Sequence, residues 1–200
     1  MIKVGLISLG CAKNLVDSEM ILGALNLSKF QIVNTTEEAD IIIVNTCGFI
    51  EASKEESIEQ ILDVCKLGKK VVVTGCLVER YKDELASSIP EVDLWIPIKE
   101  YGKFAEKIED LVGKSQKVEP LNPFNRMLST PPWMAYLRIS EGCNNCCAYC
   151  AIPLIRGHFR SRPFDDVIYE AKLLAQNGIK ELVLISQDTT RFGSDFKDKK

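Results

Sequence analysis

Short runs of β-branched residues, each followed by a stretch with helical periodicity, constrain the fold of this chain more than any other feature. The runs at 41–44 and 71–73 contain only Ile and Val, as do strands that are buried on both faces of a sheet. Further strands are predicted at 4–9, 30–33 and 94–96, and helices at 15–25, 53–65, 81–88 and 101–112. Strands that alternate with helices predict an α/β fold with a doubly wound parallel sheet.

Two details of the helices can be tested against a structure. A capping box at 53–56 predicts the start of the second helix, whose inward face is expected to carry Ile58, Ile61, Leu62 and Cys65. Core packing is therefore the better interpretation of Cys65. In the first helix, Asn14 is expected to be the cap, with Asp17 and Glu19 compensating the helix dipole just inside it.

The strand–helix pattern lapses at 113–132, where Gly and Pro punctuate a polar stretch that we interpret as a linker after a first domain at 1–112. The second domain, 133–200, reads as a strand at 136–140, a helix from Pro163 to about Gly178, and a parallel strand at 182–185. The helix is expected to bury Val167, Ile168, Ala171 and Leu174. This is one βαβ unit, the first part of a (β/α) barrel. Because a complete barrel takes roughly 250 residues, we expect this domain to be cut short.

The chain contains eight cysteines and one histidine among its 200 residues. No apolar run is long enough to span a bilayer, and the N-terminus reads as a strand and not as a signal peptide, so we expect a cytoplasmic protein. Clustered thiols in that compartment bind metal or do chemistry more often than they form disulfides. The single histidine nearly excludes mixed Cys/His zinc sites. A net charge of −3 gives no general attraction to nucleic acid or anionic membrane.

Cys143, Cys147 and Cys150 form a C-x₃-C-x₂-C pattern on a loop that follows a predicted strand. Three thiolates can hold three irons of a 4Fe–4S cluster and leave the fourth iron open to a substrate or cofactor. The alternative is a structural zinc site that also uses Cys146. Adjacent Cys146 and Cys147 could hardly both reach one tetrahedral ion, so we favour the cluster and treat Cys146 as a non-ligand.

Three arginines follow this loop, Arg156, Arg160 and Arg162. They are as compatible with a solvated basic turn as with stabilisation of an anionic cluster or cofactor.

Cys11, Cys47 and Cys76 each follow a predicted strand closely, with a glycine beside each of them. The carboxyl ends of parallel strands lie at one edge of a sheet, so three cysteines far apart in sequence are expected to converge on one site. The glycines would let the backbone pass close to a bulky ligand. Any one of these cysteines could simply be packed at a strand end. Three in the same position favour a metal or cluster site.

The most specific segments are SLGCAKNLVDSE at 8–19, NTCGFIEASKEES at 45–57, TGCL at 74–77, and the cysteine loop with its flanks at 139–153 and 156–163. They resemble the motifs of the methylthiotransferase family of radical S-adenosylmethionine enzymes, in the same order. The segments at 13–16 and 48–51 are similar to the branch that acts on an aspartate of ribosomal protein twelve of the small subunit. The sister branch acts on tRNA adenosine.

The resemblance implies two 4Fe–4S clusters and S-adenosylmethionine as cofactors. Cys143, Cys147 and Cys150 would hold the radical cluster, with Tyr149 beside the cofactor, and Cys11, Cys47 and Cys76 would hold an auxiliary cluster. One S-adenosylmethionine would methylate sulfur, and a second would supply a radical that removes hydrogen from the β-carbon of the aspartate. An electron donor such as flavodoxin or ferredoxin is implied, and no membrane partner. The alternatives are tRNA modification, or a non-catalytic iron–sulfur fragment, because the family's remaining barrel and C-terminal β-domain are absent.

Overall fold

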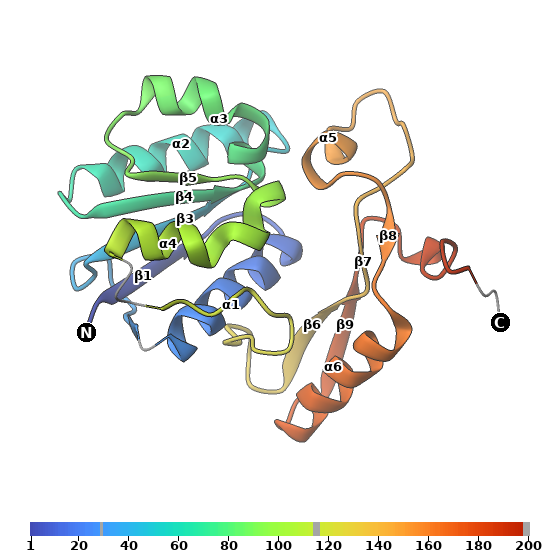
Figure 1. The fold of residues 1–200 in the computed structure, drawn as a ribbon. Coiled ribbons are helices and arrows are strands. Elements are labelled where there is room, and N and C mark those ends of the chain that lie inside the picture. Colours follow the sequence, from blue (N-terminus) through green and yellow to red (C-terminus); the bar gives the residue numbers. More distant parts are fainter. Residues whose placement is uncertain (29, 114–116, 198–200) are drawn as a thin grey trace. The chain divides into compact units, whose positions relative to one another are not determined.

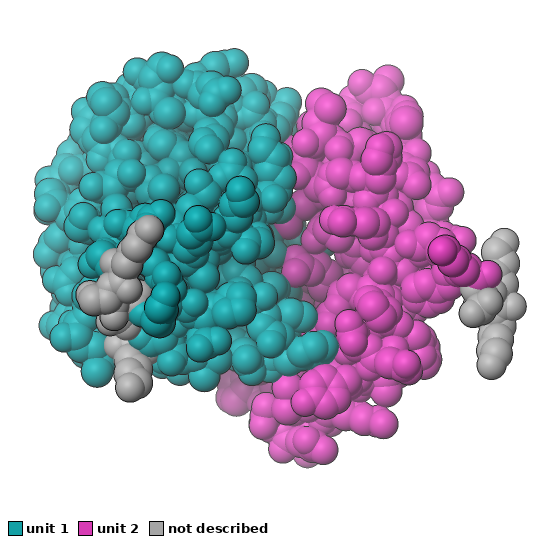
Figure 2. Space-filling view, viewed as in Figure 1, with its two compact units in different colours: residues 1–127 teal, residues 128–200 magenta. Residues whose placement is uncertain are grey.

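The computed structural model describes residues 1–28, 30–113 and 117–197, and the chain forms two compact units, Met1–Met127 and Leu128–Lys200 (Figure 1; Figure 2, in different colours). The predicted linker at 113–132 spans the boundary between the units, and its residues 114–116 lie outside the described part of the chain. Among the described residues, no helix combines the length and the apolar character needed to cross a membrane.

The first unit is built on a sheet of five strands in the order β2-β1-β3-β4-β5, and every neighbouring pair is parallel. The strands are β1 (Lys3–Ser8), β2 (Gln31–Ile32), β3 (Ile41–Thr46), β4 (Lys70–Gly75) and β5 (Leu94–Ile96). The chain adds strands outward in one direction from β1 and in the other from β3. The topological switch therefore lies between β1 and β3, where α/β sheets place their ligands. The α/β fold predicted from the sequence is confirmed.

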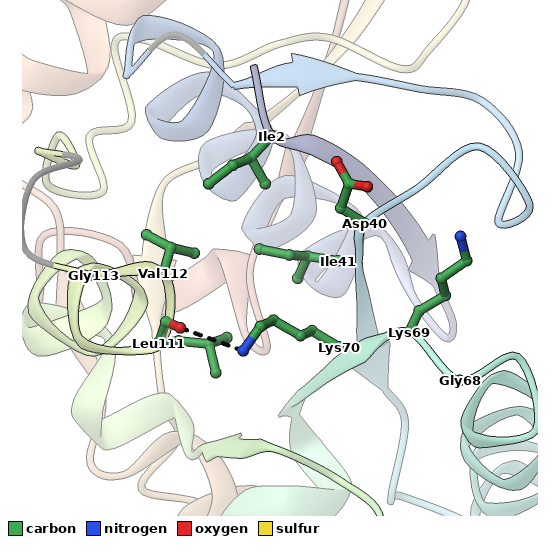
Figure 3. A pocket seen from close by; sticks show the side chains of 9 residues that line it. All are labelled: Ile2, Asp40, Ile41, Gly68, Lys69, Lys70, Leu111, Val112 and Gly113. Carbon is green, nitrogen blue, oxygen red and sulfur yellow. Dashed lines mark hydrogen bonds between the residues drawn. The ribbon is translucent and has the colours of Figure 1, made fainter.

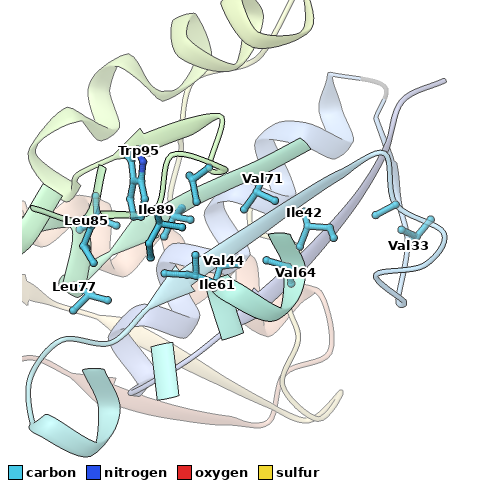
Figure 4. Close-up of a cluster of buried hydrophobic side chains, with 14 residues drawn as sticks. Val33, Ile42, Val44, Ile61, Val64, Val71, Leu77, Leu85, Ile89 and Trp95 are labelled. Atoms are coloured by element: carbon cyan, nitrogen blue, oxygen red, sulfur yellow. The ribbon is translucent and has the colours of Figure 1, made fainter. Parts of the chain in front are cut away.

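Helices cover both faces of this sheet. On one face, α2 (Glu51–Cys65) and α3 (Cys76–Ser88) bury Ile61, Val64 and Leu77 against the inward side chains of β3 and β4, a cluster drawn in Figure 4. On the other face, α1 (Ala12–Leu27) and α4 (Phe104–Val112) bury Ile21 and Phe104. Residues of β3 are buried along its whole length, which is why its sequence shows no polar alternation.

Several predicted details of the helices are wrong. The capping box does not start α2, because the first turn closes from Lys54 N–H to the Ile50 carbonyl and the helix begins at Glu51. Leu62 is exposed, so only part of the predicted inward face is buried. The helix α3 begins at Cys76, well before the predicted start, because its first turn buries Leu77 and Val78 before a kink at Tyr81.

Asn14 is not the cap of α1. The cap is Cys11, and Asn14 is fully buried within the helix, as are Asp17 and Glu19. These acidic side chains therefore do not form an exposed dipole-compensating turn. Glu19 instead pairs with Arg126, whose Nη2 lies 3.2 Å from Glu19 Oε2.

Part of the predicted linker packs on α1. Val118 is buried, and the Met127 N–H donates to the Glu19 carbonyl. A Cβ at Gly23 would lie 1.7 Å from the carbonyl oxygen of Asn125, so only glycine leaves room for this segment to pass over the helix. The segment 117–127 therefore belongs to the first unit.

The second unit contains the predicted βαβ arrangement. Its strands β6 (Met134–Arg138) and β9 (Glu181–Ile185) are parallel, and α6 (Phe164–Gln176) connects them. Val167 and Leu174 of α6 are buried, but Ile168 is exposed, contrary to the prediction. The unit also contains a short antiparallel pair, β7 (Ser140–Glu141) with β8 (Arg160–Ser161), and the short helix α5 (Ile152–Arg156), none of which was predicted. The pair β7–β8 closes the base of the cysteine loop.

Candidate functional site

Cys11, Cys47 and Cys76 lie at the carboxyl ends of three adjacent strands. Cys47 directly follows β3 and Cys76 directly follows β4, while Cys11 lies a short turn beyond β1 and caps α1. Since these strands are parallel neighbours in the sheet, their ends share one edge. Cys11 is exposed, Cys47 is half-buried and Cys76 is buried.

The loops that carry these cysteines are packed tightly against one another. A Cβ at Gly10 would lie 3.2 Å from Cys47 Sγ, and a Cβ at Gly48 would lie 2.6 Å from the Leu77 Cα. A Cβ at Gly75, whose φ is +100°, would lie 2.4 Å from the Thr46 carbonyl oxygen. The glycines therefore let the loops approach each other, and not, as predicted, a bulky ligand approach the backbone.

Polar side chains fix the Cys47 loop from two helices. The Ser57 hydroxyl of α2 donates to the Cys47 carbonyl at 2.9 Å and accepts from the Cys47 N–H at 3.1 Å. Arg80 of α3 donates from Nη1 to the Gly48 carbonyl at 2.7 Å. The backbone on both sides of the Cys47 thiol is thus held in place.

Asn14 connects the three loops and was missed as a site residue. Its amide nitrogen donates to the Leu9 carbonyl at 3.1 Å and to the Thr46 carbonyl at 2.8 Å. Its Oδ1 lies 3.3 Å from Cys76 Sγ, which donates to it. The available signal was its place one helical turn after Cys11, on the same side of α1.

In the second unit, the cysteine loop begins where β7 ends. Cys143 is buried, its N–H donates to the Gly157 carbonyl at 3.1 Å, and the Asn145 N–H lies 3.4 Å from its Sγ. The Cys150 N–H donates to the Cys147 carbonyl at 3.0 Å, which forms a tight turn. Cys147 is exposed, and Tyr149 is 89% exposed.

Asparagine side chains organise the rest of this loop. Asn144 Oδ1 accepts from the Phe159 N–H at 2.9 Å, and Asn145 donates to Asp188 at 3.2 Å. Cys146 is exposed, and its Sγ lies 3.7 Å from the Asn144 carbonyl oxygen. Cys146 and its neighbour Cys147 are thus both exposed on this loop.

Two of the three arginines after the loop form ion pairs, Arg156 while buried and Arg162 while half-buried, so the interpretation as a solvated turn is wrong for them. Arg156 Nη1 lies 3.7 Å from Glu141 Oε2, and the same carboxylate lies 3.2 Å from Arg138 Nη1. Arg162 pairs with the buried Glu170 and donates to the Arg138 carbonyl. Arg160 is exposed on β8.

The donor chemistry of both cysteine sets fits an iron–sulfur cluster. Within the described residues, no three His, Cys, Asp or Glu side chains are placed to hold one metal ion. A cubane presents a different iron to each thiolate, so its ligands need not surround one point. Each set contributes thiols only, which are the ligands that such clusters take.

Figure 3 shows a pocket of about 660 Å³ at the other edge of the first sheet. Asp40 and Lys70 line it at the starts of β3 and β4, and the Lys70 ammonium contacts the Leu111 carbonyl at 3.5 Å. No cysteine lines this pocket, so it is separate from the cysteine edge.

Two family models match the chain. The model described as "Uncharacterized protein family UPF0004" matches residues 3–97, and the model of the radical SAM superfamily matches residues 137–200. The proteins named ribosomal protein uS12 methylthiotransferase RimO from Clostridium botulinum and Alkaliphilus oremlandii are 48% and 52% identical to it. These alignments cover 99% and 96% of this chain. The chain belongs to the methylthiotransferase family of radical S-adenosylmethionine enzymes.

The matched relatives are longer than this chain. The alignments cover 47% of the C. botulinum protein and 45% of the A. oremlandii protein, so the chain spans about half the length of the curated relatives it matches. The motifs that carry the family resemblance at 8–19, 45–57 and 74–77 lie within the first matched segment, and the cysteine loop lies within the second.

Solved structures share the fold at low sequence identity. A radical S-adenosylmethionine methyltransferase, TsrM, from Kitasatospora setae, with cobalamin and a [4Fe-4S] cluster bound, aligns with a TM-score of 0.61 at 14% identity. The alignment covers 94% of this chain and 49% of TsrM. At this identity the likeness concerns the fold alone.

Proposed function

We propose that this chain is the cluster-bearing part of a methylthiotransferase that adds a methylthio group to the β-carbon of an aspartate of ribosomal protein uS12. The observation that supports this most strongly is the combination of two three-cysteine sets with about 50% identity to proteins of that name. Each set leaves a cubane one iron without a protein ligand, which is what a cluster needs to bind a cofactor or a sulfur species directly.

The radical cluster is assigned to Cys143, Cys147 and Cys150. These residues lie on a single loop, on which Cys143 is buried, Cys150 is half-buried and Cys147 is exposed, so a cofactor can reach the loop at Cys147. Tyr149 stands beside the last ligand with its ring free to contact bound S-adenosylmethionine. Cys146 is excluded from the ligand set, because a single tight loop cannot direct two adjacent thiols to the same cluster edge.

The auxiliary cluster is assigned to Cys11, Cys47 and Cys76 at the edge of the first sheet. When bound, the two clusters and S-adenosylmethionine would supply the radical that removes a hydrogen and the sulfur that replaces it. The residues of the chain would provide the framework: Ser57 and Arg80 fix the Cys47 loop, and Asn14 joins the loops to one another.

The choice of substrate rests on the names of the relatives and on charge. Binding to tRNA depends on contacts with phosphate, and this chain carries a net charge of −3. An aspartate of ribosomal protein uS12 is therefore the favoured substrate. The clusters require reduced thiols and a one-electron donor such as flavodoxin or ferredoxin, which agrees with a cytoplasmic location.

The test is to incubate the full-length protein anaerobically with S-adenosylmethionine, a reductant, and either uS12 or unmodified tRNA. A methylthio group in place of one hydrogen is expected on the uS12 peptide that contains the aspartate, measured by mass spectrometry. Modification of tRNA alone would assign the chain to the sister branch. Intact clusters without either product would favour a non-catalytic iron–sulfur protein.

A further inference from the structure

We propose that Asn14 is a positioning residue that holds the three cysteine-bearing loops of the first unit in register for one cluster. The inference deepens the proposed function and rests on it, since it takes Cys11, Cys47 and Cys76 as ligands of that cluster. Asn14 itself carries no thiol and is not a ligand in this assignment.

The contacts of Asn14 reach every one of the three loops. The Leu9 carbonyl belongs to the loop that leads into Cys11, and the Thr46 carbonyl directly precedes Cys47. The third contact is with Cys76 itself, at 3.3 Å from Oδ1 to Sγ. Asn14 also stands one turn after Cys11 on α1, so the helix cap and the amide move together. A single side chain thus touches the backbone or thiol of each loop.

The amide is completely buried, which makes these contacts costly to lose. Its exposed fraction is 0%, its amide nitrogen donates to two carbonyls, and its oxygen accepts from a thiol. An asparagine amide offers two donors and an acceptor oxygen with two lone pairs, so both donors and the oxygen take part in these hydrogen bonds. A satisfied buried network of this kind specifies one arrangement of the chain segments that it joins.

The backbone of Asn14 is fixed by a second asparagine. The Asn45 amide of β3 donates to the Asn14 carbonyl at 2.8 Å and to the Ser18 hydroxyl at 2.9 Å. The first turns of α1 are therefore tied to β3 from both sides, by Asn14 reaching toward the strand and by Asn45 reaching back. Because the backbone of Asn14 is held by Asn45, the orientation of the Asn14 side-chain amide is held as well.

Of the three contacts of the Asn14 side chain, only the one with Cys76 needs a protonated thiol. A cysteine that binds iron is a thiolate, so the donation from Cys76 to Asn14 belongs to the protein without its cluster. The two contacts with the Leu9 and Thr46 carbonyls involve no thiol and are independent of cluster loading. We infer that these two contacts hold the Cys11 and Cys47 loops together in both states.

The competing explanation is that Asn14 only stabilises the core, and a matched control separates the two. Ser28 lies at the other end of α1, is also buried, and also joins separate segments: its hydroxyl donates to the Ala24 carbonyl at 2.6 Å and accepts from the Glu119 N–H at 2.7 Å. It touches none of the cysteine loops in these contacts. Ser28→Ala should therefore lower stability without affecting a cluster.

The experiment uses the full-length protein with Cys143, Cys147 and Cys150 replaced by alanine, so that only the auxiliary cluster can be loaded. Asn14→Asp keeps the size of the side chain but places an oxygen against the Leu9 and Thr46 carbonyls. Asn14→Ser shortens the side chain so that it no longer contacts these carbonyls. Each protein is reconstituted anaerobically with iron and sulfide. Iron is measured per folded chain, with the folded fraction taken from circular dichroism, and the reduced cluster is examined by electron paramagnetic resonance.

The parent and Ser28→Ala are expected to bind about four irons per folded chain, while both Asn14 variants fall below half of that and show an altered resonance for the remaining cluster. Iron per folded chain that stays at the value of the parent protein, with an unchanged resonance, would overturn the role of Asn14. A parent protein that binds no four-iron cluster would instead overturn the ligand assignment in the proposed function. The two failures are thereby distinguishable.

Discussion

The two cysteine sets that we propose as cluster ligands are arranged in opposite ways. Cys143, Cys147 and Cys150 lie on a single loop and are close to one another in the sequence. The cysteines of the first unit lie on three loops, which share one edge only because β1, β3 and β4 are parallel neighbours. One set is therefore defined by local chain turns, and the other by the topology of a whole sheet.

The supports of the two sets differ in the same way. In the first unit the supporting side chains are buried: Asn14 and Thr46 are fully enclosed, and Thr46 donates to the Thr74 carbonyl of the neighbouring strand at 2.6 Å. In the second unit, Asn145 contacts Asp188 and Arg191 near the surface. A change that distorts the first sheet should thus weaken cluster binding at the proposed auxiliary site. Cluster binding at the cysteine loop should depend instead on the turns of the loop itself and on the solvent.

The largest expected effect comes from removing one ligand of the loop. Cys147→Ala should lose the radical cluster and about half of the iron of the fully reconstituted full-length protein, because a cubane held by two thiolates is poorly retained. The auxiliary cluster should remain, since its ligands lie in the other unit. Iron and sulfide analysis with Mössbauer spectroscopy measures both.

Cys146→Ala is the matched control for this prediction, because it removes the adjacent exposed thiol from the same loop. It should leave the iron content unchanged. If Cys146→Ala lost the cluster and Cys147→Ala kept it, the ligand assignment would be shifted by one residue.

The sequence predicted the sheet and the edge that the loops of Cys11, Cys47 and Cys76 share, because β-branched runs and strand–helix alternation fix which loops lie at one edge. It did not predict the role of Asn14, since an asparagine near a helix start is more often a cap than a buried crosslink. It also missed the passage of 117–127 over Gly23, because polar residues punctuated by proline look the same in a linker and in a packed segment. Such contacts depend on side chains distant in sequence, which periodicity cannot pair.

A smaller effect, on the spacing of the strand ends that carry Cys47 and Cys76, is expected from Gly75→Ala. The new Cβ would lie 2.4 Å from the Thr46 carbonyl oxygen and 2.5 Å from Asn45 Oδ1, at a φ of +100°. Backbone strain and overpacking together should cost on the order of 3 kcal/mol. The strand ends should separate, and auxiliary iron should fall while the radical cluster remains. Denaturant unfolding and iron analysis test this.

Gly68→Ala provides the comparison for that variant. Gly68 also has a positive φ, of +65°, but a Cβ there would meet nothing within 4 Å. Only the left-handed backbone is penalised, at about 1 kcal/mol, and both clusters should load normally. Equal loss of auxiliary iron in the two variants would mean that general destabilisation, and not crowding of the strand ends, controls the site.

A modest effect is expected from Cys65→Ala. Cys65 packs against the core at the end of α2, and burial raises the pKa of its thiol, as do the carboxylates of Glu91 and Asp93. A thiol kept protonated in this way is a poor metal ligand. Its removal should cost about 1 kcal/mol of stability through lost packing and leave both clusters intact. Loss of a cluster in this variant would contradict the division between ligand and core cysteines.

The smallest expected effect is a difference in acid sensitivity between the contacts that support the cysteine loop and those that support the edge of the first sheet. The Thr190 hydroxyl, followed by the Asn145 amide, holds the pKa of Asp188 below its ordinary value by donating to the carboxylate. Because the pKa is lower in the folded protein, this contribution to stability is complete above the ordinary pKa of about 3.9. It is lost as the pH falls through the lower folded value. The asparagines that tie the first site together do not titrate, so acid should loosen the contact of the loop with Asp188 before it affects the sheet edge.

The measurement is the carboxyl ¹³C chemical shift of Asp188, followed by NMR as the cluster-free protein is titrated with acid. In the unmodified chain the midpoint should lie below that of an ordinary aspartate. Thr190→Val should raise it most, because the Thr190 hydroxyl is the largest cause of the depression, and Asn145→Ala should raise it less. Side-chain amide signals of Asn14 and Asn45 should stay constant over the same pH range. If those signals shift together with Asp188, the sheet edge and the loop are not independent supports, and the contrast between the two cysteine sets fails.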